Sequence, residues 1–169
     1  MQTILLSRGL TTQVDDDVFE WASKIKWWAT AGKNIYAVRQ GRTGEPTTVY
    51  LHHEILSPPE GLHVDHIDRN TLFNPRSNLR VCTAQQNLWN VPGKGGKSKY
   101  KGVHFVVRKI ALKRPWMTRI RTVEGRKCIG YFRSEEEAAI AYDMAAVKEH
   151  KEFACLNFPE LKEKYYGLR

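Results

Sequence analysis

Two short strands are predicted near the middle of the chain from the order of its apolar and polar residues. Residues 64–66 begin apolar and become polar, which is typical of a strand that runs out into a site. Residues 78–81 alternate between polar and apolar side chains, the period of a half-buried strand. Residues 68–77 contain Asn, Pro and charged side chains, so we expect a loop between the two strands.

A helix is predicted to follow the second strand. Thr83 and Gln86 are three residues apart and match a capping box, in which each side chain bonds the other residue's backbone N–H. The helix should therefore begin at Ala84, and Asn87 should lie in its first or second turn. The complete order is strand, loop, strand and helix.

The first part of the chain predicts further strands and one helix. The strand candidates are residues 3–6, 35–39 and 47–51, together with a strand that begins at Trp27. An amphipathic run follows Asp15, Asp16 and Asp17, which we interpret as a helix start because the helix dipole favours acidic residues there. A metal site in this acidic triplet is the rarer explanation.

The last part of the chain predicts a sheet and a long helix. The strand candidates are residues 103–108, 116–123 and 127–132, the last two joined by a Glu-Gly turn. In the central strand, Arg119 and Arg121 fall on the face opposite the apolar residues. Ser134 and Glu137 match a second capping box, and the alanine-rich helix at 135–150 can lie close to a sheet. We expect a three-stranded antiparallel sheet with one face on the helix and the other face basic.

Positive charge is concentrated in one part of the chain. The formal net charge is +9 and the isoelectric point about 9.6, which favours a polyanionic partner such as nucleic acid or an anionic membrane surface. Residues 92–133 contain thirteen Lys or Arg and one acid, Glu124, whereas the rest of the chain is net acidic. The polyanion-binding surface should therefore lie mostly after the strand–loop–strand–helix stretch.

The remaining composition argues against a membrane or disulfide-rich protein. No apolar run approaches the ~20 residues that span a bilayer, and the first apolar stretch is too short for a secretory signal. Cys82, Cys128 and Cys155 are odd in number and widely spaced, so they indicate neither a zinc knuckle nor a disulfide framework. We expect a reducing, cytoplasmic setting.

Asp65, His66 and Asn87 should lie close together at one end of the predicted strand–loop–strand–helix unit. Carboxylate and amide oxygens suit Mg²⁺, which keeps several waters, so two protein ligands and a substrate phosphate are enough. A His with a pKa near its usual value of about 6.5 can take a proton from water at neutral pH. This combination favours phosphodiester hydrolysis. The plainer alternative is a hydrogen-bonded surface His beside a solvated Asp, and such a fold can also persist with an inactive site.

Residues 64–87, VDHIDRNTLFNPRSNLRVCTAQQN, resemble the His-Asn-His (HNH) nuclease motif of the ββα-metal fold, in particular the homing endonucleases of phages and introns. The family's Asp-His pair falls on Asp65 and His66. Its central Asn falls on Asn78 and its third motif position on Asn87. The resemblance implies that His66 is the general base and that Asn78 braces the loop. It also implies that Asp65 and Asn87 hold one Mg²⁺ or Mn²⁺ per active site.

His52 and Arg80 are candidates for supporting the active site. His52 matches the His of a His-Arg pair in the homing branch, whereas His53 stands where that branch has Arg. His52 could lie near the scissile phosphate, or it could pack the base of the site through hydrogen bonds. The second interpretation is the more common situation for such a residue.

Residues 98–159 resemble the DNA-binding domain of plant Apetala-two and ethylene-response-factor proteins. The matching segments are 100–103, 116–121, 129–132, 136–139, 141–143 and 156–159. The resemblance implies DNA contacts from Lys101, His104, Arg119, Arg121, Arg126 and Tyr131. Cys128 stands where the plant domains have a DNA-contacting Trp, and Arg119 where they often have Glu. The plant target sequence is therefore not transferred to this chain.

The chain as a whole is predicted to be an α+β protein with two modules. A ββα-metal HNH module covers 1–91 with its motif at 64–90, a basic Gly-rich linker covers 92–99, and a tail covers 160–169. Between them, at 100–159, lies the three-stranded antiparallel sheet packed on one helix.

The predicted function is that of a metal-dependent, homing-type DNA endonuclease. We expect a monomer, encoded by a phage or mobile element, that nicks double-stranded DNA in the host cytoplasm without a membrane or a small-molecule cofactor. A DNA-binding regulator with an inactive nuclease module is the alternative. An RNA-binding or RNA-cleaving protein is less favoured, because the aromatic ribonucleoprotein motif is missing.

Overall fold

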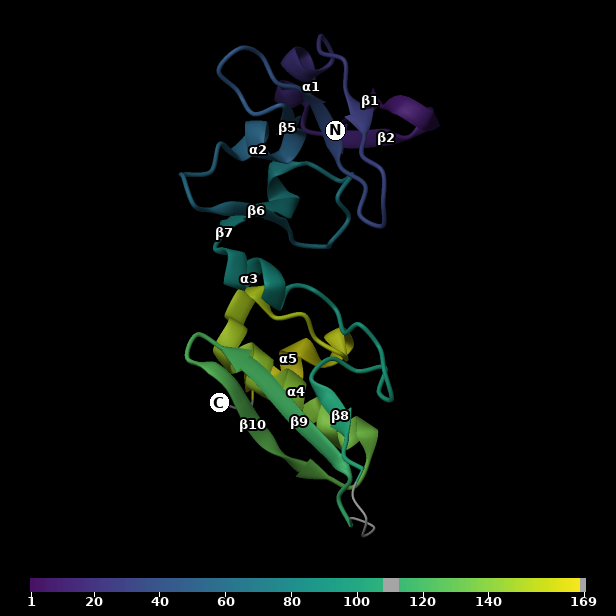
Figure 1. Cartoon of the computed structure of the whole chain (residues 1–169), viewed down its shortest axis with the longest axis vertical. Helices are drawn as coiled ribbons and strands as arrows, with labels where there is room; N and C mark the ends of the chain where they lie inside the picture. Colours follow the sequence, from purple (N-terminus) through teal and green to yellow (C-terminus); the bar gives the residue numbers. More distant parts are fainter. Residues whose placement is uncertain (108–112, 168–169) are drawn as a thin grey trace. The chain divides into compact units, whose positions relative to one another are not determined.

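A computed structural model describes residues 1–107 and 113–167 of the chain. The chain divides into two compact units, Met1–Asn87 (unit 1) and Leu88–Arg169 (unit 2). Each unit combines helices with small antiparallel sheets (Figure 1), so the predicted mixture of helices and small sheets is confirmed. Within the described residues, no helix has both the length and the apolar character needed to cross a bilayer.

Unit 1 begins with a hairpin followed by a small sheet. The hairpin pairs β1 (Gln2–Leu5) with β2 (Thr11–Val14), and the sheet has the order β3 (Trp28–Ala29), β4 (Ala37–Gln40), β5 (Thr48–Tyr50). The helix predicted after the acidic triplet is α1 (Asp16–Ala22). It packs Val18 and Ala22 into a core that also holds Val14 and Leu51.

The helix α2 (Leu51–Leu56) follows β5 directly and was not predicted from the sequence. It has only six residues and starts without a side-chain cap, so no helical period could be read from it. Arg39 of β4 anchors α2, because its Nε donates to Glu54 Oε2 at 3.0 Å and its Nη2 to Glu54 Oε1 at 2.5 Å. Its Nη1 also donates to Glu45 Oε2 at 2.7 Å. This clamp holds the helix that carries His52.

A second hairpin and the first residues of a short helix complete unit 1, and the helix ends in unit 2. β6 (His63–His66) pairs with β7 (Leu79–Cys82), and α3 (Ala84–Trp89) begins where the capping box predicted. Both halves of the box are present, because Thr83 N donates to Gln86 Oε1 at 2.8 Å and Gln86 N donates to Thr83 Oγ1 at 3.2 Å. The strand register places Asp65 opposite Arg80.

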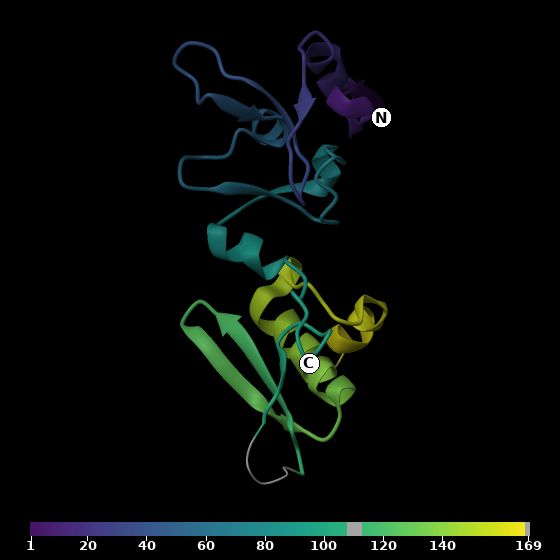
Figure 2. The same cartoon turned by 45° about the vertical axis from the view of Figure 1, so that its right-hand side comes forward.

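Unit 2 is organised around an antiparallel sheet in the order β10 (Gly125–Phe132), β9 (Trp116–Thr122), β8 (Val103–Phe105). β9 and β10 form its long hairpin (Figure 2), with a bulge between Cys128 and Gly130. The first strand of this sheet was predicted for residues 103–108, but it ends at Phe105, so the prediction is wrong at residues 106 and 107, and Arg108 lies outside the described residues.

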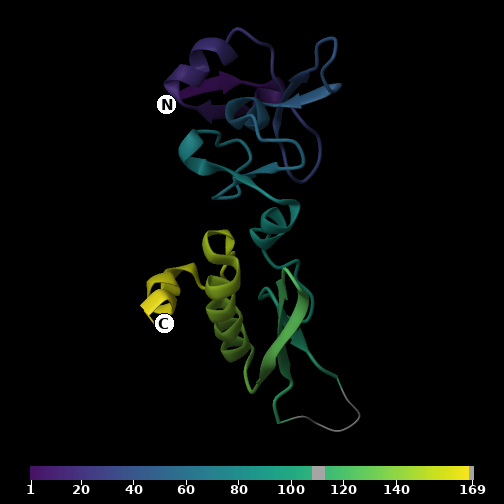
Figure 3. The ribbon, with the colours of Figure 1, turned by 90° about the vertical axis from the view of Figure 1, so that its left-hand side faces the viewer.

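The helix α4 (Glu135–His150) lies along one face of this sheet (Figure 3). Ser134 Oγ accepts from Glu137 N at 3.1 Å, the cap bond that the sequence predicted. Ile120 of β9 is buried against Tyr142 and Ala146 of α4. The ring of Tyr142 also lies against Gly102, where a Cβ atom would come within 2.1 Å of it, so only glycine fits there.

The segments that flank the sheet and α4 are also packed within unit 2. Trp89 stacks on His150 with 4.3 Å between the ring centroids, and Lys99 N donates to Glu135 Oε1 at 3.2 Å. After α4 in the chain, the short helix α5 (Lys162–Gly167) buries Tyr165. Short 3-10 turns occur at Ser7–Gly9, Arg76–Asn78, Lys151–Phe153 and Pro159–Leu161.

Candidate active site and nucleic-acid interface

Asp65 and His66 are neighbours at the end of β6, and both are buried, with 5% and 4% of their surfaces exposed. The Asp65 carboxylate accepts from Arg80 across the strand pair, with Nε and Nη2 lying 2.9 Å and 2.6 Å from Oδ2. A buried carboxylate is stable only when it is paired or hydrogen-bonded. Arg80 therefore fixes the orientation of Asp65.

The imidazole of His66 is held on two sides. Its Nε2 lies 3.0 Å from Oδ1 of Asn74, and its ring lies 5.0 Å from that of His52. Burial lowers the pKa of His66, although the Asn74 hydrogen bond and the charges of Asp65 and Asp68 act in the opposite direction. The ring is therefore neutral at neutral pH and can accept a proton.

His52 lies in an aromatic cluster behind His66. It is 6% exposed, and its ring packs against His53, Tyr36 and Tyr50, at centroid distances between 4.8 Å and 5.4 Å. Burial, together with the charges of His66 and His53, lowers the pKa of His52 to about 3. Its burial favours the packing role over direct contact with a phosphate.

Asn78 closes the loop between β6 and β7. Its Oδ1 accepts from Asp68 N at 3.0 Å, and its Nδ2 donates to Asp68 Oδ1 and to Phe73 O, each at 2.8 Å. These bonds brace the loop that leads away from His66. Asn87 belongs to α3, where its backbone N–H donates to Thr83 O at 3.0 Å, and so it is positioned by the helix and not by the loop.

Sequence reasoning missed Asn74 and Thr12, which lie behind His66. Asn74 is 1% exposed and Thr12 is fully buried. Asn74 Nδ2 donates to Thr12 Oγ1 at 2.8 Å, although the two residues are far apart in the sequence. Asn74 is one of several loop asparagines, and no local pattern distinguishes the one that faces the histidine.

The exposed face of the unit 2 sheet carries opposed arginines. Arg119 and Arg121 of β9 are exposed, whereas Ile120 between them is buried against α4. In the antiparallel register Arg121 lies directly opposite Arg126 of β10, so both point to the same face. Opposed like charges destabilise a sheet, and this pair therefore favours an anionic partner.

A groove of about 290 Å³ on this unit gathers most of the predicted DNA-contacting residues. Lys101, His104, Arg119, Arg121 and Arg126 line it. Burial and the charges of Arg119 and Arg126 lower the pKa of His104, as expected beside a positive surface. The ammonium of Lys101 donates to Trp89 O at 2.5 Å. Tyr131 is 41% exposed on the neighbouring strand.

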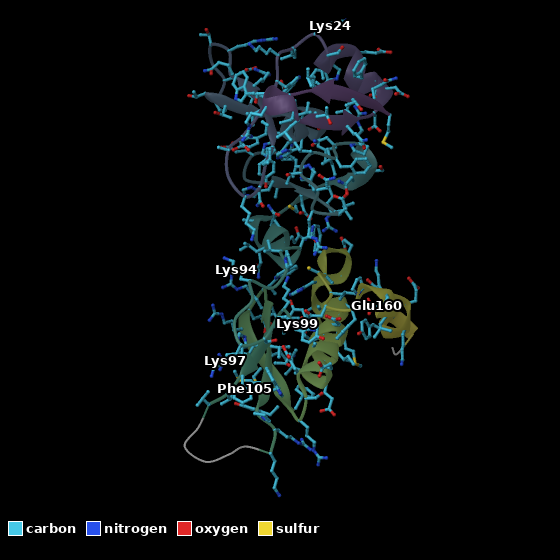
Figure 4. The ribbon with its side chains drawn as sticks, turned by 90° about the vertical axis from the view of Figure 1, so that its right-hand side faces the viewer. Lys24, Lys94, Lys97, Lys99, Phe105 and Glu160 are labelled. Atoms are coloured by element: carbon cyan, nitrogen blue, oxygen red, sulfur yellow. The ribbon has the colours of Figure 1, made fainter. Side chains whose placement is uncertain are left out.

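A second groove, of about 410 Å³, is lined by residues 93–98 and 100–105. Lys94, Lys97 and Phe105 lie at the same edge of unit 2 (Figure 4), and Lys97 Nζ sits 5.5 Å from the centroid of the Phe105 ring. Lys94 and Lys97 were not named singly as DNA contacts, although the basic 92–99 linker was expected to touch phosphate. Their positive charge in the 92–99 segment was the available signal.

Comparison with known proteins places the chain in a family. A family model described as HNH endonuclease matches residues 57–88. An uncharacterised HNH endonuclease of Acanthamoeba polyphaga mimivirus is 33% identical over 157 residues, which cover 90% of this chain and 79% of that protein. No solved structure matches the chain. The matched residues include Asp65, His66 and Asn78, and the similarity extends over most of both chains. The chain therefore belongs to the HNH endonuclease family.

Proposed function

We propose that this protein is a metal-dependent endonuclease that hydrolyses a phosphodiester of double-stranded DNA. The observation that carries the proposal is the buried pair at the end of β6, with Asp65 held by Arg80 and His66 held by Asn74. An anionic oxygen beside a neutral imidazole supplies a cation ligand and an acceptor for the proton of water.

HNH nucleases generally use a divalent cation, and we propose Mg²⁺ or Mn²⁺ for this chain. Among residues 1–107 and 113–167, no cluster of three or more His, Cys, Asp or Glu could hold a metal. The ligands we propose are the Asp65 carboxylate and the Asn87 amide oxygen. These are hard oxygen donors that suit Mg²⁺, which completes its shell with water and substrate phosphate. When bound, the ion would stabilise the charge that develops on the phosphate.

The side chains of unit 1 have the other proposed roles in the reaction. His66 takes the proton from the water that attacks phosphorus, the bond to the 3′ oxygen breaks, and that oxygen takes a proton from solvent. The products are a 5′ phosphate and a 3′ hydroxyl. Arg80 orients Asp65, His52 packs behind His66, and Asn78 keeps the loop closed. With one motif per chain, a monomer cuts one strand on each visit.

The proposed role of unit 2 is to hold the nuclease on duplex DNA. The face with Arg119, Arg121 and Arg126 carries positive charge without helix cover, and a small antiparallel sheet is the right size to enter a major groove. Lys94 and Lys97 extend this surface beyond the sheet. The resemblance to the Apetala-two domains supports the same role, with Lys101, His104 and Tyr131 as further contacts.

We also propose that the protein is a homing-type enzyme. The resemblance of residues 64–87 to phage and intron enzymes supports a phage or mobile-element origin and action in the cytoplasm of a host cell. The sequence of the DNA target is a separate question from the reaction.

The nuclease proposal is tested by incubating supercoiled plasmid with Mg²⁺ and either the wild type or His66→Ala. We expect nicked circles from the wild type, and no cleavage with chelator or with the variant. Thermal unfolding followed by circular dichroism serves as the control that the variant is folded, and binding of labelled duplex shows that it still reaches DNA. Equal cleavage by His66→Ala would contradict the role of His66.

One observation favours the alternative of a DNA-binding regulator with an inactive nuclease module. The Arg80–Asp65 ion pair competes with a cation for the Asp65 carboxylate. If the protein is such a regulator, the wild type should bind duplex DNA without cutting it. This should hold for DNA of the source genome and for a random-sequence library.

A further inference from the structure

The side-chain amide of Asn74 has only one orientation that satisfies its neighbours. Its Nδ2 lies 3.3 Å from the carbonyl oxygen of Thr71, which can only accept a hydrogen bond. It also lies 2.8 Å from Thr12 Oγ1, whose own hydrogen is donated to Leu72 O at 2.8 Å. Both neighbours therefore require the NH₂ group on their side. The oxygen of the amide must face His66.

This orientation determines which nitrogen of His66 carries the proton in the neutral ring. Oδ1 of Asn74 is an acceptor, and it lies 3.0 Å from Nε2 of His66. Nε2 must then donate, because an unprotonated Nε2 would place two lone pairs against each other in a buried site. In the neutral imidazole the lone pair consequently resides on Nδ1.

Thr12 and Asn74 hold this arrangement from a distant part of unit 1. Thr12 is on β2, and that strand is tied to the loop by Gln13 N, which donates to Leu72 O at 3.0 Å, and by Asn74 N, which donates to Gln13 O at 2.9 Å. The amide is thus held by backbone on one side and by a buried hydroxyl on the other. It cannot rotate without breaking at least two hydrogen bonds.

We propose that Asn74 is a positioning residue that holds His66 in the Nε2–H tautomer and so makes Nδ1 the atom that accepts the proton from water. This inference rests on the proposed nuclease function for its catalytic part only. Loss of the partner that orients a metal-ligating histidine typically costs about 10- to 100-fold in activity, and we expect a loss of that order when His66 loses Asn74. Asn74 touches neither water nor phosphate in this scheme and acts only through His66.

The first test is spectroscopic and needs no DNA. Nitrogen-15 NMR of the histidine rings distinguishes a protonated from an unprotonated ring nitrogen, with His66 assigned by comparison with His66→Gln. Wild type should show a protonated Nε2 and an unprotonated Nδ1. In Asn74→Leu, which has a similar volume and no acceptor, the signals should move toward the other tautomer. Unchanged signals in Asn74→Leu would overturn the proposal.

Asn74→Asp keeps an oxygen facing His66 but loses the NH₂ group that Thr71 O and Thr12 Oγ1 require, so its carboxyl group must carry a proton on that side to replace the donor. In that protonated form it should keep the Nε2–H tautomer, and an Nδ1–H ring in folded Asn74→Asp would equally overturn the proposal. Thr12→Val controls for general disturbance, because Thr71 O still holds the amide. It should retain the wild-type tautomer.

The second test is kinetic and uses plasmid cleavage at saturating Mg²⁺. Asn74→Leu should lower kcat about 10- to 100-fold with little change in KM, and Asn74→Asp should recover part of the loss. A changed tautomer with unchanged kcat would contradict the positioning role. If the wild type cuts no DNA, the proposed function fails, whereas the NMR spectra still decide whether Asn74 sets the tautomer.

Discussion

At the scale of single residues, two equally buried histidines differ in their neighbours. His66 and His52 both lie under 10% exposed, but His66 has Asn74 and two nearby carboxylates, whereas His52 has other aromatic rings. The motif spacing predicted His66 and Asp65 as site residues. It could not identify Asn74, because its role comes from a contact between β2 and the loop that no local pattern encodes.

The depressed pKa of His52 predicts a loss of stability in acid. The unfolded chain binds a proton at His52 below about pH 6.5, whereas the folded pKa is about 3, so the folded state excludes that proton over this range. The free energy of unfolding should therefore fall as the pH decreases from 6.5 toward 3. His52→Gln should remove about 2 kcal/mol of this dependence between pH 7 and pH 5.

Urea unfolding at several pH values measures this effect. His63→Gln is the control, because His63 is exposed. A pH dependence in His52→Gln as steep as in the wild type would show that His52 is not the residue responsible.

At the scale of secondary-structure elements, elements with strong local signals were predicted best. The capping box of Thr83 and Gln86 located the start of α3, and the alternation in residues 116–123 separated the buried from the exposed face of β9. β2 and α2 were missed because both are short, and their stability comes from contacts elsewhere in unit 1. The helix that carries His52 therefore had no signal in its own sequence.

The Arg39 clamp predicts how α2 is held. Arg39 is 5% exposed, and Arg39→Met would leave Glu54 and Glu45 close together without their cation. We expect a loss of about 2–3 kcal/mol in the free energy of unfolding, because breaking a largely buried ion pair leaves charges uncompensated. Thermal and denaturant unfolding measure the change. Arg42→Met, the same substitution at an exposed site, should change stability by less than about 0.5 kcal/mol. Equal effects of the two substitutions would argue against the clamp.

At the scale of the whole molecule, the sequence predicted that the catalytic motif and the positively charged surface lie in different parts of the chain. The motif residues Asp65, His66 and Asn78 belong to unit 1, and the arginines of β9 and β10 belong to unit 2. Composition alone located the net positive charge in residues 92–133. It could not show which arginines oppose each other, because that depends on the strand register.

The opposed arginines predict a specific salt dependence of DNA binding. Arg121→Ala and Arg126→Ala should each weaken duplex binding and reduce the slope of log affinity against log salt by about 1, because each would release one counterion fewer. Lys127→Ala is the matched control, since Lys127 follows Arg126 on the same strand but pairs with Ile120 on the helix side and reaches Glu149. Fluorescence anisotropy with a labelled duplex measures the slopes. A slope change in Lys127→Ala equal to that of the arginine variants would mean that the sheet face is not the DNA surface.

The division of labour between Asp65 and His66 is the central claim, and a Mg²⁺ titration of the DNA cleavage rate tests it most directly. The wild type, Asp65→Asn and His66→Gln would be compared on one plasmid substrate. Asp65→Asn should need a higher Mg²⁺ concentration for half-maximal rate, because it removes an anionic ligand. His66→Gln should keep the wild-type half-saturating concentration and lose most of the rate at saturating Mg²⁺. If His66→Gln shifted the Mg²⁺ requirement while Asp65→Asn did not, the assignment of metal ligand and base would be contradicted.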